Sequence, residues 1–376
     1  MKIVQLVYSL DYGGAEIFVV GLANKLSERN DVTLVLLKEH TVNMLPLSRL
    51  SERVNVLFLP QKKKWSLKNW FRLYQLLKDL NPDVIHTHLS TIAYAFPFAI
   101  LKKKPLVHTI HSLAYKDANP VTIKLLRFLF RNFKQIKPVA ISNEVLQTVR
   151  STYGAQFTYM IQNGVSIPEK TNNFQAVSQE ISQLKFDSNT KVIINVASVK
   201  KIKNQLFLVE AINKLIRNNA NIILINIGAV SQEEASYFEQ VKKVAGNGIH
   251  FLGPKQNVGD YLRNSDIFCL TSEYEGLPLS LLEALSVGLL PVCSEVGGII
   301  DVLQKQKEPV GYTFPPNNQD IFERQIIKAC RETAEKREQN SKRIRDLYQR
   351  NYTMEICAQN YEQLFQQAIK VNGTSS

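Results

Sequence analysis

Two carboxylates, Glu275 and Glu283, stand eight positions apart around a Gly-Leu-Pro turn. The apolar run from Asp266 to Leu270 predicts a buried strand before the turn, and LSLLEALSVG predicts a helix after it. A strand that passes through a glycine turn into a helix presents backbone N–H groups and a positive helix end to a phosphate. We expect both glutamates to face one crevice. The competing interpretation is an exposed turn followed by an ordinary amphipathic helix.

A second glycine turn follows the first predicted strand. The opening MKIVQLVYSL is largely apolar without strict alternation, as is typical of a parallel strand covered on both faces. Gly13 and Gly14 come next and lead into a predicted helix, where the backbone could approach a ligand closely. The competing interpretation is a tight turn with no ligand.

Four of the six histidines lie between residues 86 and 111, at the ends of two predicted strands. His86-x-His88 and His108-x-x-His111 would suit a metal only if the strands were neighbours, and no Asp, Glu or Cys clusters with them. We therefore expect no metal site. We expect His111 to donate a hydrogen bond to a substrate and the other three histidines to lie in the core.

Predicted strands and helices alternate through the chain, which indicates doubly wound parallel sheets. They include a helix that Ser142 could cap and a short strand at residues 160–167. At 376 residues the chain is long for one core, so two domains are expected. The polar stretch 168–190 predicts a linker between a first domain, residues 1–167, and a second, residues 191–352. Ligands of such sheets bind outside the carboxyl ends of the strands, where Gly13, Gly14, His86, His88 and His111 fall.

The composition is that of a soluble globular protein, with 45% apolar and 21% charged residues. The first residues lack the features of a signal peptide, and the longest apolar stretch is too short to span a membrane. Four scattered cysteines predict reduced core thiols of a cytosolic protein. The expected location is the cytoplasm.

Basic charge is concentrated in the first half of the chain. Residues 1–165 hold 22 Lys and Arg against 10 Asp and Glu, whereas the remainder holds 24 against 23. This asymmetry predicts an anionic partner for the first domain. Lysines and arginines are mixed with aromatic residues in residues 61–78 and 123–137, and Lys102–Lys104 add a further basic run. No nucleic-acid-binding motif accompanies this charge, so we expect no nucleic-acid partner.

Motifs in a consistent order give the chain a family resemblance. They are GGAE from Gly13, HTIHS, AISNEV, QNGV from Gln162, KKIKN from Lys200, and the stretch from YLRNSDIFCL through EGLPLSLLEA to EVGGIIDVL. With these motifs the chain resembles the retaining family 4 glycosyltransferases of the GT-B fold. The resemblance covers nearly the whole chain. It implies two facing Rossmann-like domains and a C-terminal helix, residues 353–370, that crosses back to the first domain.

The resemblance also implies a nucleotide-sugar donor held mainly by the second domain. Glu283 matches a glutamate that accepts hydrogen bonds from the ribose, and Glu275 one that contacts the sugar hydroxyls. The backbone amides of Gly276 and Leu277 would bind the sugar or diphosphate oxygens. Lys203 matches a basic residue that neutralises the diphosphate.

The first domain would supply the remaining contacts to the donor. The Gly13–Gly14 loop would close on the diphosphate, and His111 would hydrogen-bond the sugar near the anomeric carbon. At Ser198 the sequence departs from the family, which often has an arginine there. Lys200 or Lys201 could replace that charge, but an ammonium lacks the planar fork of a guanidinium.

The implied reaction transfers a hexose or N-acetylhexosamine with retention, to a glycan or lipid-linked acceptor in cell-envelope polysaccharide synthesis. A uridine diphosphate sugar is the favoured donor, with guanosine diphosphate mannose second. Glu275, His111 and Lys203 are the candidate catalytic residues, and no cofactor is expected. An Asp-x-Asp diphosphate–metal motif is absent from the sequence, so the leaving group would rely on Lys203 and backbone N–H groups.

A lipid-linked acceptor would explain the basic first domain through attachment to an anionic membrane surface at its cytoplasmic face. The competing interpretation places the aromatic residues in the core and the lysines in solvent. Two other functions remain open at this point. They are a nucleotide-sugar 2-epimerase of the same architecture and a sugar-nucleotide-binding protein without activity.

Overall fold

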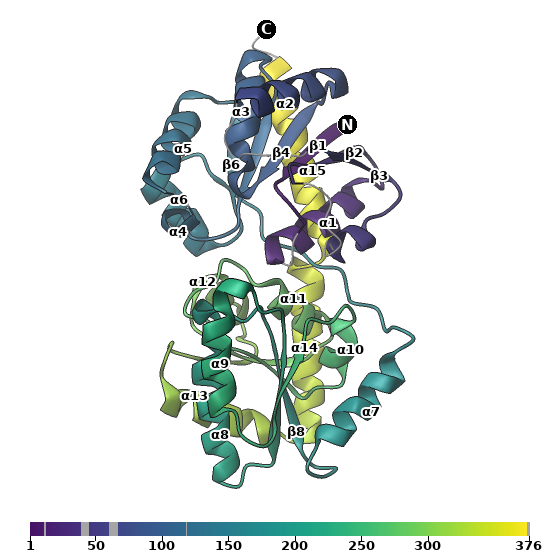
Figure 1. The fold of residues 1–376 in the computed structure, drawn as a ribbon, viewed down its shortest axis with the longest axis vertical. Helices are drawn as coiled ribbons and strands as arrows, with labels where there is room; N and C mark the ends of the chain where they lie inside the picture. Colours follow the sequence, from purple (N-terminus) through teal and green to yellow (C-terminus); the bar gives the residue numbers. More distant parts are fainter. Residues whose placement is uncertain (11–12, 39–44, 60–66, 118, 374–376) are drawn as a thin grey trace. The chain divides into compact units, whose positions relative to one another are not determined.

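The computed structural model describes residues 1–10, 13–38, 45–59, 67–117 and 119–373 (Figure 1). The chain forms two compact units, one of Met1–Val165 with Met354–Ser376 and the other of Ser166–Thr353. Each unit is built on its own parallel sheet, so the predicted pair of Rossmann-like domains is confirmed. The C-terminal helix belongs with the first unit, also as predicted.

The sheet of the first unit has seven parallel strands that wind outward in both directions from β1. In spatial order they are β3 (Val54–Phe58), β2 (Asp31–Leu36), β1 (Lys2–Val7), β4 (Val84–His88), β5 (Leu106–Ile110), β6 (Ile136–Ala140) and β7 (Tyr159–Met160). Every residue of β4 and β5 is buried, as expected for strands covered on both faces. The order of the strands reverses between β1 and β4, which is where ligands of such sheets bind.

Helices connect the strands of the first unit and cover its sheet (Figure 1). They are α1 (Gly14–Leu26), α2 (Leu67–Leu80), α3 (Ile92–Leu101), α4 (Ala114–Asp117), α5 (Pro120–Asn132), α6 (Asn143–Tyr153) and α15 (Met354–Gly373). The predicted cap of α6 is present, because the Ser142 hydroxyl accepts a hydrogen bond from the Val145 amide at 3.3 Å. At its other end α6 stops at Gly154, whose φ of 64° is left-handed.

The sheet of the second unit repeats this winding with six parallel strands. Their order is β10 (Ile249–Gly253), β9 (Ile222–Ile227), β8 (Lys191–Val196), β11 (Ile267–Leu270), β12 (Leu290–Ser294) and β13 (Tyr312–Phe314). The helices are α7 (Phe174–Leu184), α8 (Gln205–Arg217), α9 (Ala235–Val244), α10 (Val258–Arg263), α11 (Leu279–Ser286), α12 (Gly297–Leu303), α13 (Gln319–Cys330) and α14 (Ala334–Asn351). Here the strand order reverses between β8 and β11.

Two local expectations were wrong. Residues 168–190, expected to be a linker, contain α7, which buries Val177 and Ile181 and forms part of the second unit. The hydroxyl of Thr171 anchors this segment by donating to Asp260 at 2.5 Å. The sequence misled because polar residues dominate the stretch as a whole, although Val177 and Ile181 have helical spacing inside it. The strand expected over residues 160–167 is much shorter in the structure, where β7 covers Tyr159–Met160.

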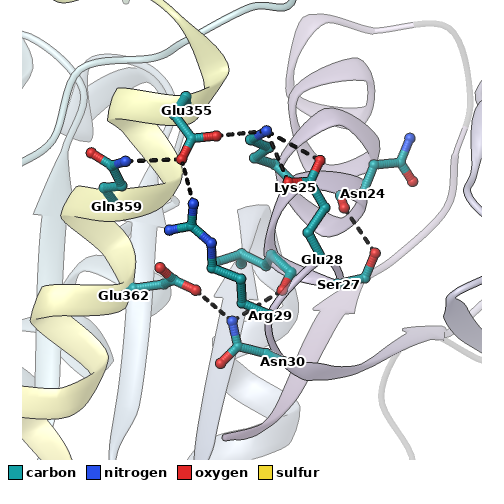
Figure 2. Close-up of polar contacts among 10 residues, drawn as sticks. Asn24, Lys25, Ser27, Glu28, Arg29, Asn30, Glu355, Gln359 and Glu362 are labelled. Atoms are coloured by element: carbon teal, nitrogen blue, oxygen red, sulfur yellow. Dashed lines mark hydrogen bonds and ion pairs between the residues drawn. The ribbon is translucent and has the colours of Figure 1, made fainter.

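The C-terminal helix α15 lies against α1, and charged side chains join the two helices (Figure 2). The Glu355 carboxylate contacts Lys25 Nζ at 2.5 Å and Arg29 at 3.2 Å. Two turns further along α15, Glu362 accepts a hydrogen bond from the side-chain amide of Asn30 at 2.5 Å. The hydrogen bond with Lys25 lowers the pKa of Glu355, so this carboxylate stays ionised.

A buried polar contact joins α15 to the sheet itself. The Tyr361 hydroxyl, on a fully buried side chain, lies 2.8 Å from Thr109 Oγ1 on β5. Thr109 Oγ1 also lies 2.8 Å from His86 Nε2 on β4. Because these groups are buried away from solvent, each depends on the others for its hydrogen bonds. The C-terminal helix is therefore an integral layer of the first unit.

All four cysteines are free, and Cys269, Cys293 and Cys357 are buried, in agreement with the expected core thiols. Among the described residues, none of the helices is both long enough and apolar enough to cross a membrane.

We predict that the buried hydrogen bond of Tyr361 contributes more stability than the ion pair between Glu355 and Lys25. Tyr361→Phe should lower the free energy of unfolding by about 1 kcal/mol, because it removes a buried hydrogen bond. Glu355→Gln should cost about 0.5 kcal/mol or less, because solvent reaches this partly exposed ion pair and screens it. Urea denaturation at low and high salt measures both, and only the Glu355→Gln effect should shrink with salt. Equal costs at both salt concentrations would contradict this ranking.

Candidate functional site

The strongest constellation in the second unit joins the loops that leave β8 and β11, the two strands at the reversal of strand order. Lys203 Nζ lies 2.7 Å from Glu275 Oε1 and 2.8 Å from Oε2, so the ammonium spans the whole carboxylate. The Ser272 hydroxyl also donates to Glu275 Oε1 at 2.6 Å. The Glu275 side chain is 8% exposed and that of Lys203 23%. The structure thus brings together two predicted site residues 72 positions apart.

Backbone contacts hold these two loops against each other. The Glu273 amide donates to the Ile202 carbonyl at 2.9 Å, and the Thr271 hydroxyl lies 3.2 Å from the Lys203 carbonyl. Asn204 ends the short 3-10 turn Lys201–Lys203 with a left-handed φ of 55°, which asparagine tolerates better than most residues. The ion pair is therefore set by two fixed backbones.

An ammonium carries three N–H donors, and Glu275 takes two of them. Lys203 can therefore donate its third hydrogen to an anionic oxygen without leaving Glu275. The carboxylate in turn retains lone pairs that could accept from hydroxyl groups. Arranged in this way, the pair can hold a ligand that has both an anionic part and a hydroxylated part.

The sequence prediction missed two glycines that shape this loop, Gly297 and Gly298. Gly297 has a left-handed φ of 53°, and a Cβ on it would overlap the Glu275 carbonyl oxygen. A Cβ on Gly298 would overlap the Gly276 carbonyl oxygen, which accepts a hydrogen bond from the Gly298 amide at 2.8 Å. Only glycine fits this close approach of two backbones. The signal available in the sequence was the Gly-Gly pair directly after a predicted strand.

The remaining predicted residues of the second unit lie near this loop in the chain. Gly276 and Leu277 follow Glu275 directly, and Leu277 is 4% exposed. Glu283 lies on α11 and is half-buried, whereas most side chains of that helix are buried. The structure thus leaves Glu283 partly accessible to solvent.

Ser198 lies on the loop after β8, where its backbone carbonyl accepts a hydrogen bond from the side-chain amide of Gln205 at 2.9 Å. Ser198 is half-buried, while Lys200 and Lys201 are exposed. Of the three lysines in this loop, Lys203 is the one paired with Glu275. The family often has an arginine at position 198. Its replacement by Lys200 or Lys201 stays a prediction.

In the first unit, the predicted glycines stand where α1 begins. Gly13 is the residue before the helix and Gly14 its first residue. A Cβ on Gly14 would meet nothing within 4 Å, and a Cβ on Gly13 would meet only the flexible side chain of Glu16. Packing among the described residues therefore does not explain the glycine at position 14. A close approach of a ligand would explain it.

The histidines of β4 and β5 form hydrogen-bonded contacts at the carboxyl ends of these strands. His88 Nδ1 lies 3.0 Å from His111 Nε2, and His108 Nδ1 lies 3.0 Å from Thr87 Oγ1. His86, His88 and His108 are buried, as expected, and His111 is half-buried. Burial lowers the pKa of His111 to about 4 and of His108 to about 3, so both rings are neutral at physiological pH. No group of three or more possible metal ligands occurs among the described residues.

We predict that the Lys203–Glu275 pair matters to folding as well as to binding. Lys203→Met leaves a nearly buried carboxylate without its cation and should lower the free energy of unfolding by about 2 kcal/mol. Lys203→Met combined with Glu275→Gln leaves no buried charge, so at least half of that loss should be recovered. Urea denaturation measures both variants, with Lys242→Met, at an exposed ion pair with Glu239, as the control. If the double variant were less stable than Lys203→Met, the carboxylate would not be the source of the loss.

Two family models match the chain. One described as "Glycosyltransferase Family 4" covers residues 12–168, and one described as "Glycosyl transferases group 1" covers residues 177–347. A curated relative from Escherichia coli is an alpha-1,3-galactosyltransferase that uses UDP-Gal and an alpha-D-GlcNAc-diphosphoundecaprenol acceptor. It is 25% identical over 273 residues, which is 70% of each chain. An alpha-1,4-N-acetyl-D-galactosaminyltransferase from Campylobacter jejuni is 29% identical over 300 residues, 76% of this chain and 77% of its own.

Solved structures share the fold over almost the whole chain. The HepE protein of Anabaena, crystallised with UDP and glucose, superposes with a TM-score of 0.83 at 18% identity, covering 98% of this chain and 100% of its own. WaaG, a glycosyltransferase of lipopolysaccharide biosynthesis, superposes with a TM-score of 0.71 at 14% identity over 95% of this chain and 98% of its own. The two matched family models together account for most of both units. The chain belongs to the family 4 glycosyltransferases, enzymes that transfer sugars, and has their GT-B fold.

Proposed function

We propose that the protein transfers a hexose or N-acetylhexosamine from a uridine diphosphate sugar to a lipid-linked, diphosphate-bearing glycan acceptor, with retention at the anomeric carbon. A guanosine diphosphate mannose donor is second in rank. The Lys203–Glu275 pair is the observation that carries the proposal, because it offers a cation to a diphosphate and a carboxylate to sugar hydroxyls at one place. The names of the relatives support the choice of substrates, since the Escherichia coli and Campylobacter jejuni enzymes use undecaprenol-linked acceptors.

The second unit supplies most of the donor contacts in this proposal. Glu283 accepts hydrogen bonds from the ribose hydroxyls, and Glu275 accepts from the hydroxyls of the transferred sugar. The amides of Gly276 and Leu277 and the third N–H of Lys203 bind diphosphate oxygens. Carboxylate oxygens suit hydroxyl donors and N–H groups suit phosphate oxygens, so each group is matched to its partner.

The first unit contributes His111 and the Gly13–Gly14 loop. Neutral His111 donates a hydrogen bond to the sugar near its anomeric carbon. The open space beside Gly14 leaves room for the diphosphate next to the first amides of α1, where the helix dipole favours negative charge. Ser198, with Lys200 or Lys201, takes the place of the arginine that the family often has.

In the proposed reaction the acceptor hydroxyl attacks the anomeric carbon on the face from which the diphosphate leaves. The bond between that carbon and the diphosphate oxygen breaks, the bond to the acceptor oxygen forms, and the acceptor proton passes to the departing phosphate. Negative charge grows on the diphosphate as the sugar becomes oxocarbenium-like. Lys203 and the backbone amides stabilise that charge, which a divalent metal does in other transferases.

Activity measurements test the site directly. With a uridine diphosphate sugar and a polyprenyl-diphosphate-linked sugar acceptor, the protein should release uridine diphosphate in the presence of EDTA and form a product with the donor's anomeric configuration. Glu283→Gln and Lys203→Met should each lower kcat/KM by about 100-fold or more, since each removes contacts to a charged or hydroxylated group. Lys242→Met, at an exposed ion pair on α9, should leave kcat/KM unchanged.

Two outcomes would overturn the proposal. Normal turnover in both variants would refute the assigned site. Conversion of the nucleotide-sugar into its epimer without any acceptor would identify a 2-epimerase instead.

We also propose that the first unit attaches to an anionic membrane surface, where a lipid-linked acceptor would reside. Helix α5 supports this idea with what we call the α5 face: Val121, Lys124 and Phe128, spaced as on one side of a helix. Val121 is 76% exposed and Phe128 55%, opposite the buried Leu126 and Leu129. Exposed apolar groups beside basic ones suit the boundary between headgroups and acyl chains.

The segments named from the sequence share this character only in part. On α2, Phe71 is 64% exposed, but Trp70 is half-buried and packs its edge against Phe96. Lys102 and Lys103 are exposed at the end of α3. Trp65 and Lys62–Lys64 lie outside the described residues. The α5 face is therefore the surface on which the membrane proposal rests.

Vesicle sedimentation tests the α5 face. The protein should bind phosphatidylglycerol vesicles at low salt and bind phosphatidylcholine vesicles weakly. Combining Val121→Asp with Phe128→Asp should lower binding by about tenfold, because two apolar contacts are lost and two negative charges are added. Val244→Asp, at an exposed apolar position of the second unit, is the matched control. Equal binding by all variants, or no binding at low salt, would refute the proposal.

A further inference from the structure

We propose that His88 is a positioning residue that holds His111 in the tautomer with its hydrogen on Nδ1, so that His111 meets its ligand as a hydrogen-bond donor. The use of that donor rests on the proposed function. The pairing itself is a property of the first unit and can be measured without substrate.

The two rings are held together by the sheet and by packing. His88 is the last residue of β4, and the neighbouring strand β5 ends one residue before His111. Their facing nitrogens are 3.0 Å apart, and their ring centroids are 5.3 Å apart. Phe18 of α1 places its edge against both rings, at centroid distances of 6.3 Å from His88 and 5.5 Å from His111. Because His88 is fully buried, its orientation is determined by these contacts.

One hydrogen lies between His88 Nδ1 and His111 Nε2, and either ring could supply it. Burial lowers the pKa of both rings, so each is neutral and carries a single N–H. If His111 were the donor, His88 would carry its hydrogen on Nε2. That nitrogen is buried and has no hydrogen-bond partner in the described part of the chain. The molecule would then contain an orphaned buried N–H.

The reverse arrangement avoids this cost. When His88 donates from Nδ1, its Nε2 is left with a bare lone pair, and orphaned acceptors are tolerated better in protein interiors than orphaned N–H groups. His111 Nε2 then accepts, so the hydrogen of neutral His111 must lie on Nδ1. Within the described residues, no hydrogen bond uses His111 Nδ1. This N–H is therefore available to a ligand oxygen.

The tautomer also limits what His111 can do. Its Nε2 lone pair is engaged by His88 and its Nδ1 already holds a hydrogen, so His111 has no free lone pair with which to accept a proton. His111 can therefore orient or polarise a sugar oxygen, but it cannot serve as the general base that deprotonates the acceptor. The proton of the acceptor must go elsewhere, in keeping with its transfer to the departing phosphate.

Long-range ¹H–¹⁵N correlation spectra of the full chain, labelled with ¹⁵N-histidine, test the tautomer. We expect the His111 signals to show a protonated Nδ1 and a bare Nε2 at neutral pH, and those of His88 to show the same. Comparison with His111→Gln and His88→Asn assigns the signals. A hydrogen on Nε2 of His111 would overturn the inference, whether or not any sugar transfer is detected.

Substitutions at His88 test whether the pairing matters. His88→Asn can still present an N–H close to the position of Nδ1, whereas the similarly shaped His88→Asp is restricted to accepting when ionised. The aspartate should move the His111 hydrogen to Nε2 or protonate the ring, and its kcat/KM should be lower than that of the asparagine variant by about tenfold or more. Equal activities with equal His111 spectra would show that His88 has a structural role only.

The matched control is His108→Asn, which alters a buried histidine on β5 that bonds to Thr87. We expect it to leave the tautomer of His111 unchanged. If His108→Asn shifts that tautomer as much as His88→Asp does, the effect comes from general disruption of the strand ends and the assignment to His88 is wrong. Failure to find any glycosyl transfer, with the expected tautomer present, would instead count against the proposed function.

Discussion

The ion pair between Lys203 and Glu275 is the interaction on which the site of the second unit depends. It joins the loops after β8 and β11, the strands between which the order of the sheet reverses. Desolvating two charges costs free energy that their attraction only partly returns, so such a pair is weak evidence for a purely structural role. A ligand that needs both a cation and a carboxylate gives a better reason for its presence. The close packing of Gly297 and Gly298 then keeps the Glu275 loop in the shape that the pair requires.

The candidate site of the first unit differs, because its buried histidines are neutral. The sheet places histidines at the buried ends of β4 and β5, and burial lowers their pKa values until they carry no charge. Neutral rings can donate or accept according to their tautomers, which depend on neighbours such as Thr109 and Tyr361. Through Tyr361 the C-terminal helix takes part in this network. The end of the chain therefore helps to build the sheet edge at which the histidines lie.

The two parts of the chain also differ in net charge. Residues 1–165 carry nearly all of the net charge of +13, while charges in the remainder almost cancel. A basic surface attracts anions over distances of about a Debye length and raises their local concentration. A lipid-linked diphosphate in an anionic bilayer would meet such a surface first. In the proposed function the donor site needs less net charge, because Lys203 and a few backbone amides would bind one diphosphate.

By itself the sequence determined the fold class, the two-domain organisation and most of the candidate residues. Hydrophobic periodicity and glycine turns are local signals, so the strands, the loops at Gly13 and Glu275 and the cap at Ser142 could be predicted from neighbouring residues alone. Helix α7 escaped prediction because polar residues surround its apolar ones, and α10, against which it packs, lies far along the chain. Only the tertiary structure decided that Lys203 pairs with Glu275, that Gly297 and Gly298 support the loop, and that His88 contacts His111. Those contacts join residues 22 to 72 positions apart, and the order in which strands pair in the sheet, which no local pattern encodes, brings them together.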